Sequence, residues 1–361
     1  KNPAYRRPTE RRSRLGGVVD QAAPPRFAPR AATTTSMAST AVEPGFRDGP
    51  VELRGGSAGP KKFKKSWVVV KLGLCQYFNT EDFPKDQKPL DTLRLGGAAV
   101  RRADKKEAAK RDHAFVLHYP HNKKAKELFF ACDTDIELRA WMTAFGESIA
   151  YANPGVFGVD LRVAVLKSKD PIPTVLTVCI AGLAAHKATE GLFRVSGSQK
   201  DVQRLRDAFD EGDAPDLAKC DVHVIGGVLK QYLRELPNPL LTMQLFPRFL
   251  EAAKLGAREQ LAQCRKLVAS LPREHRDALA VLLHFLSDVS KECAVNMMTA
   301  RNLATCFGPT ILRSGVEGDP DASLSDLVVG VTEILIDNWE VACGVKDMPP
   351  AGGGGGGGGG G

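Results

Sequence analysis

The sequence of 361 residues lacks several features that would place it in a large class of proteins. No run of about 18 uncharged apolar residues is present, so no membrane-spanning helix is expected. No CxxC pair and no Cys/His spacing typical of a metal site occurs. We therefore expect no metal and no cofactor, and the eight cysteines are predicted to be reduced core residues of a cytosolic protein.

Motifs of self-sufficient catalysis are also absent. The sequence has no GxxxxGK[ST] loop, no strand-bounded GxGxxG, no HExxH and no GxSxG. Its seven histidines are scattered rather than placed at the spacing of metal ligands on a helix. We therefore predict a protein that is not itself an enzyme.

Positive charge is present, but it is unevenly distributed. The net charge is +8, with ten basic and five acidic residues in 1–60, and 18 basic against 12 acidic residues in 61–150. Residues 151–361 carry 22 basic and 25 acidic residues, so that part is slightly acidic. A basic chain raises nucleic acid or an anionic membrane as a partner. No nucleic-acid-binding module is recognisable here, so we expect no nucleic-acid partner.

Composition and periodicity divide the chain into four parts. Residues 1–60 are basic and proline-rich and are predicted to be disordered, and residues 346–361 form a flexible glycine-rich tail. Residues 61–151 contain strand-like runs at 67–70, 73–78, 114–119 and 127–131, followed by one helix. Thr134 and Glu137 form a capping box at the start of that helix. This part is predicted to be a small antiparallel β-barrel or sandwich closed by a helix.

Residues 155–345 have helical periodicity throughout, which predicts an all-α domain. One helix is expected to begin at Pro173, a second after Ser198, and a third to run over 221–236 and stop at Pro237. Later helices are expected over 272–290, over 299–307 and around 324–335. The Gly308-Pro309 pair is predicted to end the helix of 299–307.

A loop between the first two of these helices presents one arginine. Arg194 lies between apolar Phe193 and Val195, with Gly191 and Gly197 on either side. Buried apolar neighbours would hold Arg194 projecting from a fixed loop. Two simpler roles remain open from this segment alone: Arg194 could cap a helix end or pair with a surface carboxylate.

The third helix carries a cationic stripe. At about 100° per residue, His223, Gly227, Lys230 and Arg234 share one narrow face. Such a stripe is often only a solvated face. Glycine inside a helix costs about 1 kcal/mol relative to alanine, so Gly227 favours close approach by a partner or by another backbone.

Three ordered segments of this region resemble the signature blocks of the Rho GTPase-activating (RhoGAP) domain: 190–197 (EGLFRVSG), 229–241 (LKQYLRELPNPLL) and 296–304 (NMMTARNLA) with 307–309 (FGP). The resemblance implies that Arg194 is an arginine finger that enters the nucleotide site of a bound Rho-family GTPase. It also implies that Lys230, Arg234 and Asn302 contact that GTPase. Asn238 and Tyr232 are mild departures from the family pattern.

Residues 61–151 resemble a pleckstrin-homology (PH) domain, through the basic-aromatic run 61–70 and through Trp141 of the closing helix. For the first strand, the only candidate is the segment 51–56. The resemblance implies that a basic residue often precedes the strand tryptophan, where this chain has Ser66. Weak attraction to an anionic membrane is expected from two groups of cations. The first is Lys61, Lys62, Lys64 and Lys65, with Lys71 nearby, and the second is Arg101, Arg102, Lys105, Lys106, Lys110 and Arg111.

The sequence therefore predicts a GTPase-activating protein that supplies a catalytic arginine in trans to a GTP-bound Rho-family GTPase. The PH-like region would favour recruitment to an anionic phospholipid membrane or to a partner, and the expected location is cytoplasmic and peripheral at membranes. The alternative is a non-catalytic scaffold that only docks a Rho-family GTPase. A basic loop that binds protein or nothing remains the simpler interpretation of the PH-like region.

Overall fold

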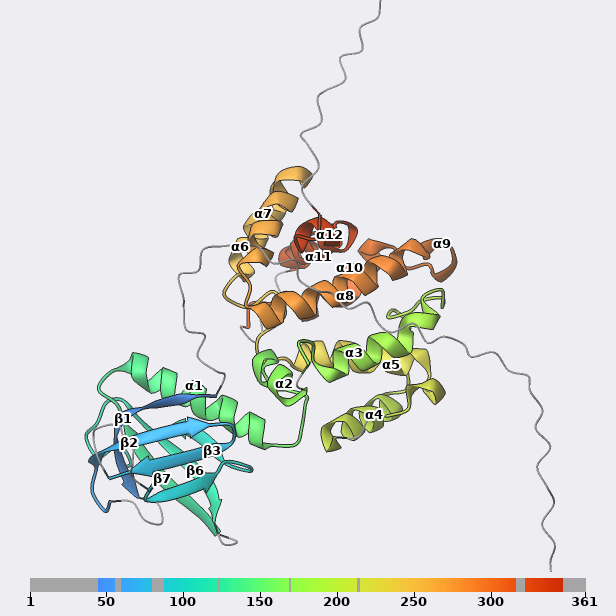
Figure 1. The fold of residues 1–361 in the computed structure, drawn as a ribbon. Helices are drawn as coiled ribbons and strands as arrows, with labels where there is room; N and C mark the ends of the chain where they lie inside the picture. Colours follow the sequence, from blue (N-terminus) through green and yellow to red (C-terminus); the bar gives the residue numbers. More distant parts are fainter. Residues whose placement is uncertain are drawn as a thin grey trace, which may run out of the picture. The chain divides into compact units, whose positions relative to one another are not determined.

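The computed structural model describes residues 45–55, 60–79, 88–121, 124–168, 170–212, 215–315 and 322–346. Within these residues an antiparallel sheet with one helix is followed along the chain by a domain built of helices (Figure 1). The predicted fold class is confirmed. The predicted segments 1–60 and 346–361 lie almost entirely outside the described residues, apart from 45–55, residue 60 and Lys346.

The sheet has seven strands in the order β4-β3-β2-β1-β7-β6-β5, and all neighbouring strands are antiparallel. Apolar side chains of its inner face, with Phe115 and Phe130 stacked at 4.6 Å between ring centroids, form a core closed by the helix α1. The bounds are β1 Arg47–Gly55, β2 Lys64–Lys71, β3 Leu74–Phe78, β4 Asp91–Arg94, β5 Ala99–Arg102, β6 Ala114–His121, β7 Lys124–Ala131 and α1 Asp135–Ala152.

One domain boundary of the sequence analysis is wrong. Residues 47–55 belong to the segment 1–60 that composition predicts to be disordered, but they form β1, which pairs with both β2 and β7. The candidate first strand 51–56 is therefore real and begins earlier than its apolar residues indicate. Gly49 and Pro50 interrupt the alternation of apolar and polar residues that would indicate a strand, whereas Val51 and Leu53 are buried in the core. The short strands β4 and β5 were not anticipated, because four residues carry too little periodicity.

The start of α1 follows the sequence prediction. The Thr134 side chain accepts a hydrogen bond from the Glu137 backbone N–H at 3.2 Å, and a Glu137 carboxylate oxygen accepts one from the Asp133 N–H. The first bond satisfies a donor that a helix start leaves open, and the second ties the residue before the cap to the first turn. Trp141 and Phe145 of α1 are buried against the sheet. This helix closes the core of the sheet domain.

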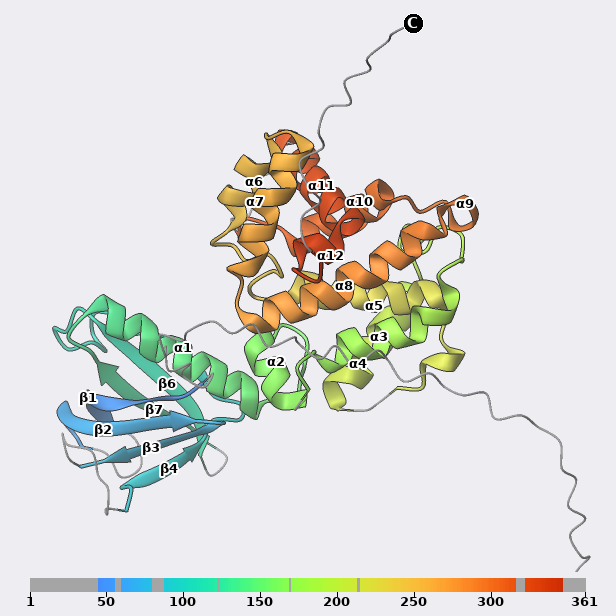
Figure 2. The same cartoon turned by 45° about the horizontal axis from the view of Figure 1, so that its top comes forward.

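Among the described residues the helical domain contains eleven α-helices and two short 3₁₀ helices. Figure 2 shows their arrangement. Helix α5 packs against α3, α4 and α10, so its apolar face lies inside the core. The bounds are α2 Leu161–Ser168, α3 Thr174–Leu183, η1 Ala184–His186, α4 Gln199–Glu211, η2 Leu217–Lys219, α5 Val222–Glu235, α6 Phe246–Ala253, α7 Ala257–Ala269, α8 Arg273–Lys291, α9 Cys293–Asn296, α10 Ala300–Ile311, α11 Ala322–Asp337 and α12 Trp339–Ala342. Residues 322 and 323 are described for their backbone only.

Helix α10 contradicts one prediction. The Gly308-Pro309 pair predicts the end of this helix, but α10 continues to Ile311 with Pro309 inside. The Leu312 N–H still donates to the Gly308 carbonyl, and the missing glycine side chain lets α11 approach closely. A Cβ at position 308 would lie 3.1 Å from a methyl carbon of Val328. Tertiary packing of α10 on α11 therefore outweighs the local tendency of Gly-Pro to end a helix.

Candidate functional site

The loop between η1 and α4 holds Arg194 on a strained but well-anchored backbone. Gly191 and Phe193 both have left-handed φ angles, of 65° and 72°. Such a φ is costly for a non-glycine residue and persists only where the surroundings fix it. The Phe193 ring is buried and makes edge contacts with Phe307 at 4.8 Å and Phe285 at 6.2 Å between centroids. Burial of Phe193 therefore fixes the residue that precedes Arg194.

Arg194 itself is exposed. Among the described residues none gives its guanidinium a hydrogen bond or an ion pair. Its backbone N–H donates to the Gly191 carbonyl at 2.8 Å. The two simpler roles therefore fail, because the side chain neither caps a helix nor pairs with a carboxylate. An unpaired cation on a fixed loop is available to a partner.

The cationic stripe of α5 lies next to this loop. A cavity of about 160 Å³ is lined by Val195 and Ser196 of the loop and by Lys230 and Arg234 of α5; its other lining residues are Gly197, Gln199, Val202, His223, Gly227 and Gln231. The four residues predicted to share a face thus face the same hollow. Ile225, Val228 and Tyr232 are buried on the opposite side of α5, as the periodicity predicts.

Lys230 supports the loop rather than standing free. Its Nζ donates a hydrogen bond to the Phe193 carbonyl oxygen, directly before Arg194. Burial lowers the pKa of Lys230, while Cys306 opposes and Arg234 adds to that lowering. No described residue forms a hydrogen bond or an ion pair with the Arg234 side chain, although its carbonyl accepts a bond from Arg313. The two α5 cations therefore differ. Lys230 supports the loop through its hydrogen bond, whereas the Arg234 side chain is accessible to a partner.

The paired glycines of α5 serve the packing of this domain. A Cβ on Gly226 would lie 3.1 Å from the Phe193 ring, and one on Gly227 would lie 2.9 Å from a Val202 methyl carbon. The close neighbours are thus side chains of the loop and of α4. The neighbours are intramolecular side chains rather than another backbone, and close approach by a partner stays a prediction.

Asn302 lies in the first turn of α10 and is exposed. Its Nδ2 donates to the Met297 carbonyl at 2.9 Å, which leaves Oδ1 directed away from that bond. Val295 and Met297 nearby are exposed apolar residues. A polar oxygen beside exposed apolar side chains is typical of a protein-binding surface.

The four lysines predicted to face lipid do not share one surface. Lys61, Lys62, Lys64 and Lys65 are all exposed, but alternation along β2 places neighbouring Lys64 and Lys65 on opposite faces. Lys64 Nζ also donates to the Asn79 side chain at 2.8 Å. Ser66 is buried on the inner face of β2.

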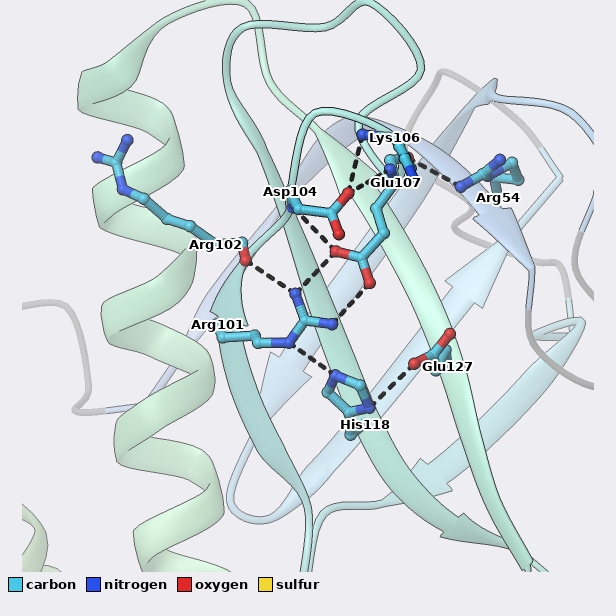
Figure 3. A network of polar contacts seen from close by, with 8 residues as sticks. All are labelled: Arg54, Arg101, Arg102, Asp104, Lys106, Glu107, His118 and Glu127. Carbon is cyan, nitrogen blue, oxygen red and sulfur yellow. Dashed lines mark hydrogen bonds and ion pairs between the residues drawn. The ribbon is translucent and has the colours of Figure 1, made fainter.

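Three of the six cations of the second basic group are paired with carboxylates within the sheet domain, and Figure 3 shows the pairing of Arg101. Arg101 forms a two-pronged ion pair with Glu107, at 2.7 and 2.6 Å, and its Nε donates to His118. That pairing is the main reason that the pKa of Glu107 falls from an ordinary value near 4.5 to about 2, with a further lowering from the Asp104 N–H. Arg102 pairs with Asp135, and Arg111 pairs with Glu52. The expected cluster of six cations is therefore reduced to three exposed lysines: Lys105, Lys106 and Lys110.

The eight cysteines differ in exposure. The eight cysteines are free, but Cys293 is exposed and four others are only half-buried, so only three are core residues as predicted. No set of three metal-ligating side chains comes together in the part of the chain that the structure describes. Within that same part, no helix combines the length and the apolar character needed to cross a bilayer.

Residues 191–197, which we call the arginine loop, are supported by groups that sequence reasoning missed. The Gly191 N–H donates to the carbonyl of Asn296, and Phe193 packs on Phe285 and Phe307. These partners lie about 90 to 115 residues further along the chain. Their only sequence signal is that Asn296 and Phe307 stand in the third signature block.

Comparison with known proteins assigns both regions. The model of the RhoGAP domain matches residues 173–316, and the model of the PH domain matches residues 46–150. Human Rho GTPase-activating protein 24 is 32% identical over 286 residues, which are 74% of this chain and 37% of that protein. Drosophila melanogaster GTPase-activating protein CdGAPr is 38% identical over 206 residues, which are 54% of this chain and 11% of that protein.

A solved structure supports the assignment of the helical domain. The crystal structure of human Rho GTPase activating protein 15 is 26% identical, covers 55% of this chain and is itself covered to 96%, with a TM-score of 0.50. The chain spans less than half the length of the curated relatives described above. The matched domains and the fold together identify this chain as a RhoGAP-domain protein in which a PH domain precedes the RhoGAP domain.

Proposed function

We propose that this chain accelerates GTP hydrolysis by a Rho-family GTPase by inserting Arg194 into the partner's nucleotide site. The observation that carries the proposal is an exposed, unpaired Arg194 on a loop fixed by buried Phe193 and by Lys230. Arg234 and Asn302 would contact the GTPase around it. The names of the relatives support the same activity.

The chemistry of GTP hydrolysis explains why an arginine suits this place. Charge accumulates on phosphate oxygens in the transition state, and a planar, permanently charged guanidinium can bond two of them. An arginine finger supplied in trans is worth roughly 10³ to 10⁵ in rate. The partner supplies the nucleotide, its Mg²⁺ and the water-orienting residue. A protein with this role needs no nucleotide motif of its own.

Single-turnover hydrolysis with a panel of GTP-loaded Rho-family GTPases tests the proposal. Arg194→Ala should lower the stimulated rate by about 10³-fold or more, while binding to a GTPase loaded with a non-hydrolysable GTP analogue changes little. Arg273→Ala is a matched control, because Arg273 is 71% exposed and lies at the start of α8. That variant should keep the wild-type rate.

Two outcomes would contradict the proposal. Full stimulation by Arg194→Ala would show that this arginine is not the finger. Binding of wild-type protein across the panel without any acceleration would favour the non-catalytic scaffold instead.

We further propose that the PH domain recruits the chain, in the cytoplasm, to the surface of an anionic membrane. Lys61 and Lys62 precede Phe63, whose ring lies 4.1 Å from the Arg111 guanidinium of the β5–β6 loop. That loop also carries Lys105, Lys106 and Lys110, so the exposed lysines of both connections lie at one end of the sheet. Each basic residue near an anionic surface contributes about 1 kcal/mol.

Sedimentation with vesicles tests the recruitment. Vesicles containing phosphatidylserine should bind the chain in low salt, and the double variant Lys61→Glu/Lys62→Glu should bind them at least about 10-fold more weakly. Arg139→Gln serves as the control, since Arg139 is already paired with Asp135 on α1. Equal binding to vesicles of phosphatidylcholine alone would contradict an electrostatic mechanism.

A further inference from the structure

The arginine loop is connected to the opposite side of the site through one buried residue, Asn296, which contributes both its side-chain amide and its main-chain carbonyl. This residue ends the short helix α9 and is fully buried. A buried amide is costly unless its donors and its acceptor are all satisfied. What Asn296 bonds to therefore shows what its burial maintains.

All hydrogen-bonding groups of the Asn296 amide are used. Nδ2 donates to the carbonyls of Lys187 and Val289, each at 2.7 Å, and Oδ1 accepts from the Met298 N–H at 2.7 Å. Two carbonyls on one side and an N–H on the other fix the orientation of the amide, because a flipped amide would lose all three bonds. No other residue type of this size provides the same pattern.

One set of these contacts leads to Arg194. Lys187, whose carbonyl accepts the side-chain bond, lies just before the arginine loop, and the Gly191 N–H donates to the main-chain carbonyl of Asn296 at 2.8 Å. The Gly191 carbonyl in turn accepts from the N–H groups of Arg194 and Val195, at 2.8 and 2.9 Å. Asn296 is thus two hydrogen bonds from the backbone of Arg194.

The other contacts lead to Asn302. Residue Met297 has a left-handed φ of 59°, and its carbonyl accepts the Nδ2 bond of Asn302. The bond from the Met298 N–H to Asn296 closes the chain around Met297 and so supports that unusual φ. The same buried amide therefore orients the carbonyl that holds Asn302.

We propose that Asn296 is a positioning residue for GTPase activation: it joins the C-terminal end of α8 to the arginine loop and to Asn302, and so sets both groups for the transition state. The inference rests on the proposed function of Arg194. Asn296 touches neither nucleotide nor partner. Its effect passes through the placement of Arg194, and a misplacement of about 1 Å can cost 10²-fold in rate.

The test uses Asn296→Asp, which keeps the size of the side chain but replaces both N–H donors with an acceptor. In single-turnover assays the maximal stimulated rate should fall about 100-fold, whereas the concentration for half-maximal stimulation changes less than about threefold. Binding to the GTPase should fall for GDP with aluminium fluoride, a transition-state mimic, and not for the GTP-analogue form. A merely structural role would not produce this split.

Controls keep the test decisive. Asn296→Ser removes the same donors without adding charge, and thermal unfolding of each variant shows whether the domain remains folded. Asn338→Asp is the matched control, since its Nδ2 bonds a backbone carbonyl at the end of α11, away from the loop. It should leave the rate unchanged.

A double-variant cycle separates this inference from the proposed function. In an Arg194→Ala background, Asn296→Asp should lower the rate far less than the fall of about 100-fold expected in the wild-type background, because most of its effect acts through the Arg194 guanidinium and only the part that acts through Asn302 is left. Independent, multiplying losses would overturn the positioning role, as would an unchanged rate in a folded Asn296→Asp protein. Full stimulation by Arg194→Ala alone would overturn the proposed function instead.

Discussion

Arg194 of the RhoGAP domain and two arginines of the PH domain have opposite environments. In the PH domain, Arg101 and Arg102 each lie 2.6 Å from a carboxylate oxygen, on Glu107 and Asp135. In the RhoGAP domain, Arg194 is exposed and has no such partner among the described residues. A guanidinium already bonded to a carboxylate is occupied by the fold, whereas an unpaired one on a rigid loop is free to bond phosphate. Positive charge in a sequence therefore marks a partner site only where the fold leaves it unpaired.

The largest expected effect is a fall of the stimulated hydrolysis rate when Arg194 is changed to lysine. The same change at Arg101 of the PH domain is the comparison. Arg194→Lys keeps the charge but loses the two-pronged geometry, so the stimulated rate should fall by about 10² to 10³-fold. Arg101→Lys should leave that rate unchanged and lower the Tm only slightly, because its pair with Glu107 is solvent-exposed and screened. Single-turnover hydrolysis and thermal unfolding measure the two effects. Equal rates for wild type and Arg194→Lys would contradict a role for the two-pronged guanidinium and would remove the contrast between Arg194 and Arg101.

A second prediction concerns the lysine that braces the loop. Lys230→Met removes the donor to the Phe193 carbonyl, and the stimulated rate should fall about 10 to 100-fold. Stability should change little, because burial lowers the pKa of Lys230 and methionine removes that desolvation cost. The combination of a lost rate and an unchanged Tm is the result to look for. A large fall in Tm would show that Lys230 mainly stabilises the fold and would contradict this prediction.

A third prediction concerns a glycine beside the arginine loop. A Cβ at Gly197 would lie 2.5 Å from the backbone nitrogen of Val224, so Gly197→Ala should destabilise the domain by about 1 to 3 kcal/mol. At Gly330 in α11 nothing lies within 4 Å of the added carbon, so Gly330→Ala should stabilise by about 0.5 to 1 kcal/mol. Chemical denaturation compares the two. Similar effects at both sites would contradict the tight packing of the loop on α5.

The smallest expected effect lies in the PH domain and depends on pH. Pairing with Arg101 lowers the pKa of Glu107 to about 2, so the ionised carboxylate stabilises the fold above its ordinary pKa near 4.5. Glu107→Gln should therefore lower stability at pH 7, by about 1 kcal/mol for an exposed pair. The difference from wild type should shrink as the pH falls below about 4.5 and vanish near pH 2.

Hydrogen exchange measured by mass spectrometry over residues 101–113 reports this effect locally. Faster exchange in Glu107→Gln at pH 7 is expected, with Arg139→Gln as a control at a more exposed ion pair. A difference that grows towards low pH would contradict the assigned sign.

Local signals predicted much of the fold. The capping groups Thr134, Ser198 and Asp221 stand at the starts of α1, α4 and α5, because a cap is a bond between near neighbours. The failures occur where distant packing intervenes. Strand β1 is hidden by Gly49 and Pro50, and α10 passes through Pro309 because α11 packs against Gly308.

The residues of the candidate site also fall into those that local sequence signals predict and those that depend on distant contacts. Motif resemblance identified Arg194, Lys230, Arg234 and Asn302, and the structure places Lys230 and Arg234 beside the arginine loop. The role of Asn296 could not be predicted, because its partners Lys187 and Gly191 precede it by more than 100 residues. The pairing of Arg101 with Glu107 is close in sequence, yet it depends on the turn that brings the two side chains together.

The sequence by itself determined the fold class, the order of the domains and the identity of the arginine loop, because periodicity, caps and signature blocks are local properties. Only the tertiary structure decided which cations are available. Arg102 pairs with Asp135 and Arg111 with Glu52, whereas Arg194 meets no carboxylate among the described residues. Electrostatic pairing depends on distance in space, and the folded chain sets that distance.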